Sequence, residues 1–282
     1  MDTVKNYMSK PITISQSSNL SDVFKKMLSE KISRLLVENN GLITEIVTEK
    51  DLGMFLLIDE SERKLGEISL SEISKKIISI NDNTELNECA KKILEYGIGS
   101  LVATSNGDVQ GIVTKTDLVK YFASAFQDKK SVGEYMTPYY AWQYSDCSLS
   151  KIVSKMIEEK ISRIILRNKN EIPEGIITFR DLFYTSLKLG QEDDVLDNSD
   201  PLISVIFPRK GFVSESGFGG SMKASEIMSK NILSVNYDDD LAQTGKLLND
   251  KKINGAGVLS KNGNLIGIIS KTDIVKALAF ME

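Results

Sequence analysis

The sequence predicts a mixed α/β protein made of four copies of one β-α-β-β-α unit. Three observations predict it: a seven-residue string ending in Asp occurs four times, an amphipathic helix precedes each copy, and a short apolar strand lies between helix and string. The strings are EIVTEKD, GIVTKTD, GIITFRD and GIISKTD, ending at Asp51, Asp117, Asp181 and Asp273. Such internal repetition is typical of a duplicated supersecondary unit.

The predicted helices carry apolar residues at positions i, i+3, i+4, i+7 and i+8, a spacing that places them on one face. They begin in turn at Leu20, Leu86, Leu149 and Leu241. The fourth pattern is weaker, because only Gly245 and Leu248 continue it. Cys89 lies on the apolar face of the second helix, so we expect it to be a small buried hydrophobe.

Each helix leads into a short apolar strand and a turn. The strands are Leu35–Val37, Leu101–Ala103, Ile164–Leu166 and Gly257–Leu259. Asn-Gly occupies three of the turns, at residues 40–41, 106–107 and 262–263. Because both residues of a type I′ turn need positive φ, Asn-Gly is a strong signal for a hairpin. The recurring string then forms the second hairpin strand, and a closing helix is expected to start near its Asp.

A leader segment stands in front of each unit. Three leaders match closely: VKNYMS from Val4, VGEYMT from Val132 and ASEIMS from Ala224. The leader LSEIS from Leu70 is degenerate. Four leaders and four strings at common offsets make the repeat secure.

Composition excludes several classes of function. The chain has no His, which removes Ser-His-Asp and Cys-His catalysis and the usual zinc sites. A net charge of −4 counts against non-specific nucleic-acid binding, which needs a basic surface. Two cysteines form no disulfide framework. We find no secretory signal and no apolar run long enough to span a membrane, and therefore expect a soluble cytoplasmic protein.

A hydroxyl residue stands three positions before each recurring Asp: Thr48, Thr114, Thr178 and Ser270. This spacing is that of a capping box, which satisfies free N–H groups at a helix start. The same groups also suit a ribose, because an ionised Asp accepts hydrogen bonds from both hydroxyls of a vicinal diol. A neighbouring helix N-terminus would favour a phosphate. The spacing alone favours capping, and the two roles are compatible.

Arg34 and Arg163 occupy the same place in the first and third repeats, at the end of a shared Lys-Ile-Ser-Arg string. The second and fourth repeats have small residues there, Gly99-Ser100 and Asn254-Gly255. A solvated or snorkelling Arg is the structural alternative. The asymmetry favours one phosphate-facing side chain for each pair of repeats, because Arg binds phosphate through two hydrogen bonds.

These leaders, strings and helices resemble the CBS domain, named for cystathionine β-synthase, over nearly the whole chain. The boundaries would be 1–58, 66–124, 131–187 and 222–282, with an inserted linker at 188–221. The resemblance implies that consecutive repeats pair into two Bateman modules, and it allows the four repeats to pack as a flat disc within one chain.

Several CBS proteins bind adenine nucleotides in clefts where the Thr/Ser-x-x-Asp motif of one repeat faces the middle-strand start of its partner. By this resemblance Arg34 would face Asp117, and Arg163 would face Asp273. The implied nucleotide-binding residues of the first module are Ile12, Ile32, Ser33, Arg34, Ile112, Thr114, Lys115, Thr116 and Asp117. Those of the second are Ala141, Ile161, Ser162, Arg163, Ile268, Ser270, Lys271, Thr272 and Asp273.

The remaining motifs are weaker candidate sites. They consist of Thr48 with Asp51 and of Thr178 with Asp181, and neither would face an Arg from a partner repeat. Glu49 would repel a phosphate in the first, whereas Arg180 would partly compensate in the second.

The resemblance implies a non-catalytic regulatory protein, a monomer or homodimer, that senses AMP, with ADP or ATP as alternative ligands. No metal is expected, and a protein effector would read the signal because the repeats occupy nearly all of the chain. A scaffold without nucleotide and a nucleic-acid-binding CBS protein are the alternatives. An enzyme is the least favoured class, because no nucleophile–base pair is visible.

Overall fold

The structure is a computed structural model that describes residues 2–59, 61, 63–182, 185, 213–214, 217–218 and 222–281. The inserted linker expected at 188–221 therefore lies outside the described residues, apart from two short strands. These strands, β12 (Val213–Ser214) and β13 (Gly217–Phe218), pair in antiparallel fashion.

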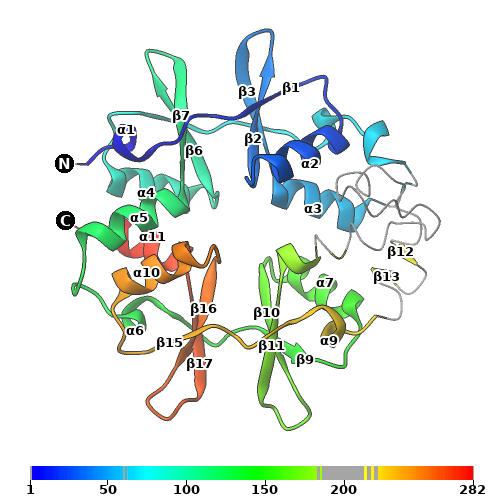
Figure 1. The fold of residues 1–282 in the computed structure, drawn as a ribbon, viewed down its shortest axis with the longest axis vertical. Coiled ribbons are helices and arrows are strands. Elements are labelled where there is room, and N and C mark those ends of the chain that lie inside the picture. Colours follow the sequence, from blue (N-terminus) through cyan, green and yellow to red (C-terminus); the bar gives the residue numbers. More distant parts are fainter. Residues whose placement is uncertain are drawn as a thin grey trace. The chain divides into compact units, whose positions relative to one another are not determined.

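The mixed α/β class and the fourfold repetition of one unit are confirmed (Figure 1). The first repeat contains β1 (Thr13–Ser15), α2 (Leu20–Ser29), β2 (Arg34–Asn39), β3 (Leu42–Thr48) and α3 (Glu49–Ile58). The second contains β5 (Ser79–Asn81), α4 (Leu86–Glu95), β6 (Ser100–Ser105), β7 (Asp108–Thr114) and α5 (Lys115–Ala125). The third contains β9 (Trp142–Tyr144), α7 (Leu149–Glu158), β10 (Arg163–Arg167) and β11 (Pro173–Thr178), followed by helical residues 179–182. The fourth contains β15 (Ser234–Asn236), α10 (Leu241–Asp250), β16 (Gly255–Leu259), β17 (Leu265–Ser270) and α11 (Lys271–Ala279).

The first helix of each repeat begins and ends at residues suited to those places. Asn19, Ser148 and Asp240 cap α2, α7 and α10 by accepting a backbone N–H with their side chains. In all four first helices, α4 included, the C-cap residue after the helix is followed by a residue with positive φ, which turns the chain into the next strand. These residues are Lys31, Gly97, Lys160 and Lys252, at φ of 54° to 62°.

Two of the three hairpins with an Asn-Gly signal have the expected turn. Asn40 and Gly41 have φ of 50° and 80°, and Asn106 and Gly107 have 51° and 90°, so both residues of each turn are left-handed as the type I′ geometry requires. At the third signal, residues 262–263, only Gly263 has a positive φ, 76°, and the chain turns over the longer loop 260–264 between β16 and β17. The strands that flank the first two turns pair in antiparallel register, with Arg34 opposite Thr48 and Ser100 opposite Thr114. Each recurring string therefore ends beside the start of the middle strand of its own repeat.

Each leader lies against a repeat other than the one it precedes in the chain. Leader one, with α1 (Val4–Tyr7), meets repeat two through the Ser9–Ile112 bridge. Leader two contributes two 3-10 turns (Leu65–Glu67 and Leu70–Glu72) and β4 (Lys75–Lys76), which pairs with β3 of repeat one. Leaders three and four contribute α6 (Val132–Tyr135) with β8 (Thr137–Pro138), and α9 (Ala224–Ile227) with β14 (Ser229–Lys230). Strand β8 pairs with β17, and β14 pairs with β11.

The chain divides into two compact units. Unit 1 holds the second and fourth repeats, with segments Met1–Pro11, Ile77–Tyr140 and Ile232–Glu282. Unit 2 holds the first and third, with Ile12–Lys76 and Ala141–Asn231. One core runs through unit 1, where α4, α5, α10 and α11 pack together (Figure 1). Phe122 of α5 is a fully buried member of this core. Unit 2 has two cores, one in repeat one and one in repeat three, and Leu57 of α3 joins the second.

Within the described residues, no helix has the length and apolar character needed to cross a membrane.

Candidate functional site

All four Thr/Ser-x-x-Asp motifs form the predicted capping boxes. In each, the backbone N–H of the Thr or Ser donates to Oδ2 of the Asp, at 3.0, 2.8, 2.7 and 2.7 Å in chain order. The hydroxyl donates to the same oxygen, at 2.7 Å for Asp117 and 2.6 Å for both Asp181 and Asp273. The Thr48 hydroxyl makes the same contact with Asp51. The cap therefore occupies one oxygen of each carboxylate.

The second oxygen, Oδ1, differs among the motifs. Lys75 Nζ lies 2.5 Å from Oδ1 of Asp51, and the Thr137 hydroxyl lies 3.5 Å from Oδ1 of Asp273. For Asp117 and Asp181, no side chain in the described part of the chain donates to Oδ1. A carboxylate oxygen left over from a capping box can accept hydrogen bonds from a bound hydroxyl group.

Unit 1 brings together two of the motifs, because α5 and α11 pack against each other. Lys115 Nζ donates to Thr272 Oγ1 at 2.9 Å, and Lys271 Nζ donates to Thr116 Oγ1 at 3.1 Å. Each motif thus supplies an ammonium to the hydroxyl of the other. Lys271 is only 6% exposed, so its charge lies in a largely desolvated place beside two helix N-termini.

Unit 2 uses the same two motif positions for an ion pair. Arg180 Nε and Nη2 donate to the two carboxylate oxygens of Glu49, at 2.9 and 3.1 Å. The Glu49 side chain is 17% exposed and that of Arg180 49%. This bidentate pair joins the third repeat to the first.

Both predicted phosphate-binding arginines lie in unit 2. Arg34 begins β2 opposite Thr48, and Arg163 begins β10 opposite Thr178. Both side chains are half-buried. Their expected counterparts, the motifs ending at Asp117 and Asp273, belong to unit 1. The pairing of each Arg with an Asp therefore stays a prediction.

Four of the six residues expected around an adenine also pack against the cores. Ile12 and Ile32 contact the core of repeat one, and Ala141 and Ile161 contact that of repeat three. In unit 1, Ile112 is buried and Ile268 half-buried. The carbonyls of Ser33 and Ser162 already accept backbone N–H groups from the closing helices, at 2.8 and 2.9 Å.

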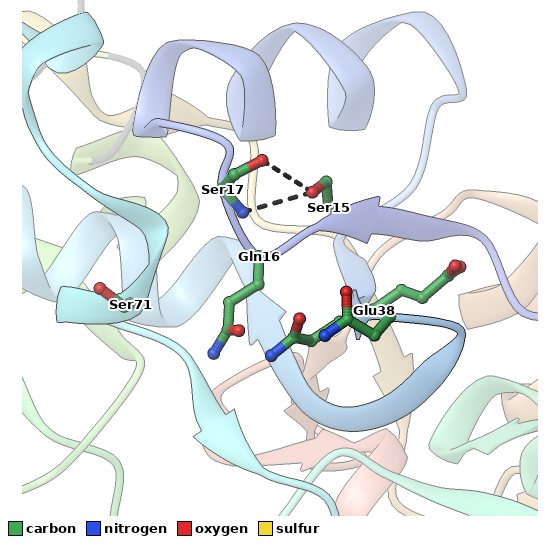
Figure 2. A pocket seen from close by; sticks show the side chains of 7 residues that line it. Ser15, Gln16, Ser17, Glu38 and Ser71 are labelled. Carbon is green, nitrogen blue, oxygen red and sulfur yellow. Dashed lines mark hydrogen bonds between the residues drawn. The ribbon is translucent and has the colours of Figure 1, made fainter.

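A polar hollow of about 540 Å³ lies in unit 2 away from all of these residues (Figure 2). Its lining is Ser15, Gln16, Ser17, Glu38, Asn39, Asn40 and Ser71. In Figure 2, Gln16 lies between Ser71 and Glu38, while the hydroxyls of Ser15 and Ser17 bond to each other at 2.9 Å. Sequence reasoning missed the hollow, because leader two closes it from a distant part of the chain.

The described residues contain no group of three or more His, Cys, Asp or Glu side chains placed to hold a metal ion. The motifs offer hydrogen-bond acceptors for hydroxyl groups, while unit 1 adds two ammonium groups at helix N-termini. Such an arrangement is suited to a ligand that carries both hydroxyl groups and negative charge.

Known proteins similar to this chain include two proteins of one archaeon and an enzyme of another. MJ1225 of Methanocaldococcus jannaschii is 19% identical over 285 residues, which cover 96% of each chain. Its crystal structure matches with a TM-score of 0.77 over 99% of this chain and 100% of its own. MJ0450 of the same organism is 28% identical over 46% of this chain and 70% of its own length. The homoserine O-acetyltransferase of Methanococcus vannielii is 22% identical over 76% of this chain but only 40% of the enzyme.

The family model of the CBS domain matches residues 4–57, 65–124, 132–188 and 224–280. These four segments make up most of the sequence and coincide with the four repeats seen in the structure. The chain therefore belongs to the CBS domain family and contains four CBS domains.

Proposed function

We propose that this protein is a non-catalytic sensor of adenine nucleotides, with AMP as its ligand and ADP and ATP as alternatives, that regulates a partner protein. The observation that carries the proposal is the pair of motifs in unit 1. Each combines an Asp whose cap uses Oδ2 alone with a Lys and a Thr at the start of a helix.

The ribose is assigned to Asp117 and Asp273. Oδ1 of each would accept hydrogen bonds from the 2′- and 3′-hydroxyls, while Oδ2 stays in the capping box. The cap fixes the carboxylate before the ligand arrives, which lowers the ordering cost of binding. The Thr137 hydroxyl, 3.5 Å from Asp273, would lie beside the same ribose.

The phosphate is assigned to Lys115 and Lys271, with help from the partial positive charge at the starts of α5 and α11. Because Lys271 is largely desolvated, its interaction with a phosphate is screened less than at an open surface. The resemblance adds Arg34 and Arg163 as phosphate ligands, and the apolar side chains set out above as neighbours of the adenine.

The comparisons support this proposal through the family and through MJ1225, which has been described as a candidate archaeal homologue of γ-AMPK. We propose no catalytic step. Binding would act by favouring one arrangement of the repeats over another, and the shift is limited by the difference in affinity between the two arrangements. A partner protein would read that difference.

Calorimetric titration with AMP, ADP and ATP, on protein freed of carried-over nucleotide, tests the proposal. We expect saturable binding that weakens about 10-fold or more in Arg34→Ala and Arg163→Ala, since each loses a charge-assisted contact. Arg63→Ala is the matched control, because that side chain pairs with Glu72 outside the motifs. Absence of heat with all three nucleotides would contradict the proposal and favour a scaffold.

A further inference from the structure

The leaders place one particular residue at the same register position of the strand that ends in each recurring motif. In the register of the sheets, Ser9 lies opposite Ile112, Thr137 opposite Ile268 and Ser229 opposite Ile176. Each of these Ile residues stands two positions before a capping Thr or Ser, on the same face of its strand. Three leaders therefore present a small hydroxyl residue at this place.

The degenerate leader presents a lysine there instead. Lys75 lies opposite Ile46, the counterpart of those Ile residues in repeat one. Its Nζ reaches Oδ1 of Asp51 at 2.5 Å, whereas the corresponding Thr137 hydroxyl lies 3.5 Å from Asp273. The lysine side chain is 70% exposed, but the Asp51 side chain that it covers is only 11% exposed.

Both oxygens of Asp51 are consequently in use within the protein. Oδ2 accepts from the backbone N–H and the hydroxyl of Thr48, and Oδ1 accepts from Lys75. The other acid of this motif, Glu49, is paired with Arg180. A diol would have to displace an ion pair over a nearly buried carboxylate to reach Asp51, which it need not do at Asp117.

Two further differences from the other repeats hold this leader against β3. In the other repeats a Gly lies beneath a Met of the leader, and a Cβ on Gly175 would come within 2.6 Å of the Met228 sulfur. Repeat one has Glu45 at that Gly position and Ser74 at the Met position, and the Ser74 hydroxyl donates to Glu45 at 2.6 Å. A polar contact thus anchors the residue directly before Lys75.

We propose that Lys75 closes the repeat-one motif from within, so that Asp51 is a structural acid and not a ribose ligand. This inference rests on the proposed ribose role of the Thr/Ser-x-x-Asp motifs. According to this inference, the Lys75 side chain alone prevents a nucleoside from binding at Asp51. Replacing that side chain by the serine found in two of the other leaders opens the motif to a vicinal diol.

The test is a calorimetric titration of Lys75→Ser with adenosine, which carries no phosphate for Glu49 to repel. We expect its binding stoichiometry to exceed that of the wild type by one. Lys76→Ser, the next residue of β4, is the matched control and should leave the stoichiometry unchanged. Adding Asp51→Asn to Lys75→Ser should remove the gained site.

Equal stoichiometry in Lys75→Ser and the wild type overturns this inference, whether that number is two or zero. A gained site in Lys75→Ser with no adenosine binding by the wild type would support the closure; titration of the wild type with AMP, whose phosphate Lys115 and Lys271 would bind, then tests the sites at Asp117 and Asp273 separately. Adenosine binding by the wild type without an additional site in Lys75→Ser would reject the closure of Asp51 and support the proposed sites at Asp117 and Asp273. A gained site that persists with Asp51→Asn would also overturn the closure.

Discussion

Lys115 and Thr272 lie 157 residues apart in sequence, yet the lysine Nζ donates to the threonine hydroxyl at 2.9 Å. The mirrored contact from Lys271 to Thr116 measures 3.1 Å. Each lysine belongs to one motif and donates to the hydroxyl of the other. Under the proposed function, a ligand that draws either lysine toward its phosphate must loosen the neighbouring motif, so the two sites of unit 1 should be coupled.

This coupling predicts an effect of Lys115 on the site that does not contain it. In an Asp117→Asn background, which leaves only the motif of Ser270–Asp273, Lys115→Met should weaken AMP binding about 3- to 10-fold, because Thr272 loses a hydrogen-bond donor. Isothermal titration measures the change. Lys120→Met, an exposed lysine of α5, is the control, and equal affinities in the two lysine variants would argue against the coupling.

The close contact between leader one and β7 predicts that a methyl group added at Gly111 lowers the stability of the protein. A Cβ on Gly111 would lie 2.7 Å from the Ser9 carbonyl oxygen and 2.9 Å from the Met8 sulfur. Gly111→Ala should therefore reduce the free energy of unfolding by about 1–3 kcal/mol, as over-packing usually does. Urea unfolding followed by circular dichroism gives the value.

Gly66→Ala is the matched control for that substitution, because no atom lies within 4 Å of the added Cβ. Its free energy of unfolding should stay near that of the wild type. If both variants lost the same stability, the close approach of leader one to β7 would not be the cause.

The buried thiol of Cys89 predicts a pH dependence. Burial raises the pKa of Cys89 from 9.0 to about 12, so the unfolded chain loses this proton at a lower pH than the folded protein does. The free energy of unfolding should then fall as the pH rises from about 9, by about 1.4 kcal/mol per pH unit at most, until the folded thiol titrates.

Other groups titrate in the same range, so the measurement compares the wild type with Cys89→Ala between pH 8 and 10.5. The wild type should lose stability more steeply than the variant. Parallel stability curves for the two proteins would show that the thiol is not protected by the fold. The expectation that Cys89 is a small buried hydrophobe is confirmed by its complete burial.

The repeat, the helices and the hairpins could be predicted because their signals are local. The fourth helix was the weakest prediction, and the structure shows why. In α10, Gly245 lies against α5 and α11, because a Cβ there would be 3.1 Å from the Val119 side chain of α5 and 3.3 Å from the Ile274 side chain of α11. A glycine that lets two helices approach closely weakens the apolar pattern even though the helix is well buried.

The position of the leaders could not be predicted from local signals. Sequence order puts each leader in front of its own repeat, but strand pairing carries it to another one. The closure of Asp51 by Lys75 depends on that register, as does the crossed contact between Lys115 and Thr272. Each of these interactions joins segments that are far apart in the sequence, and local sequence patterns do not predict such contacts.

The most direct test of the proposed AMP sites is the number of AMP molecules bound by Asp117→Asn/Asp273→Asn, measured by calorimetry beside the wild type and Asp51→Asn. Asn keeps the size of the capping side chain, and Asp51→Asn alters an equivalent cap whose second oxygen is already held by Lys75. We expect two sites in the wild type and in Asp51→Asn, and none in the double variant. Undiminished binding by the double variant would contradict this expectation.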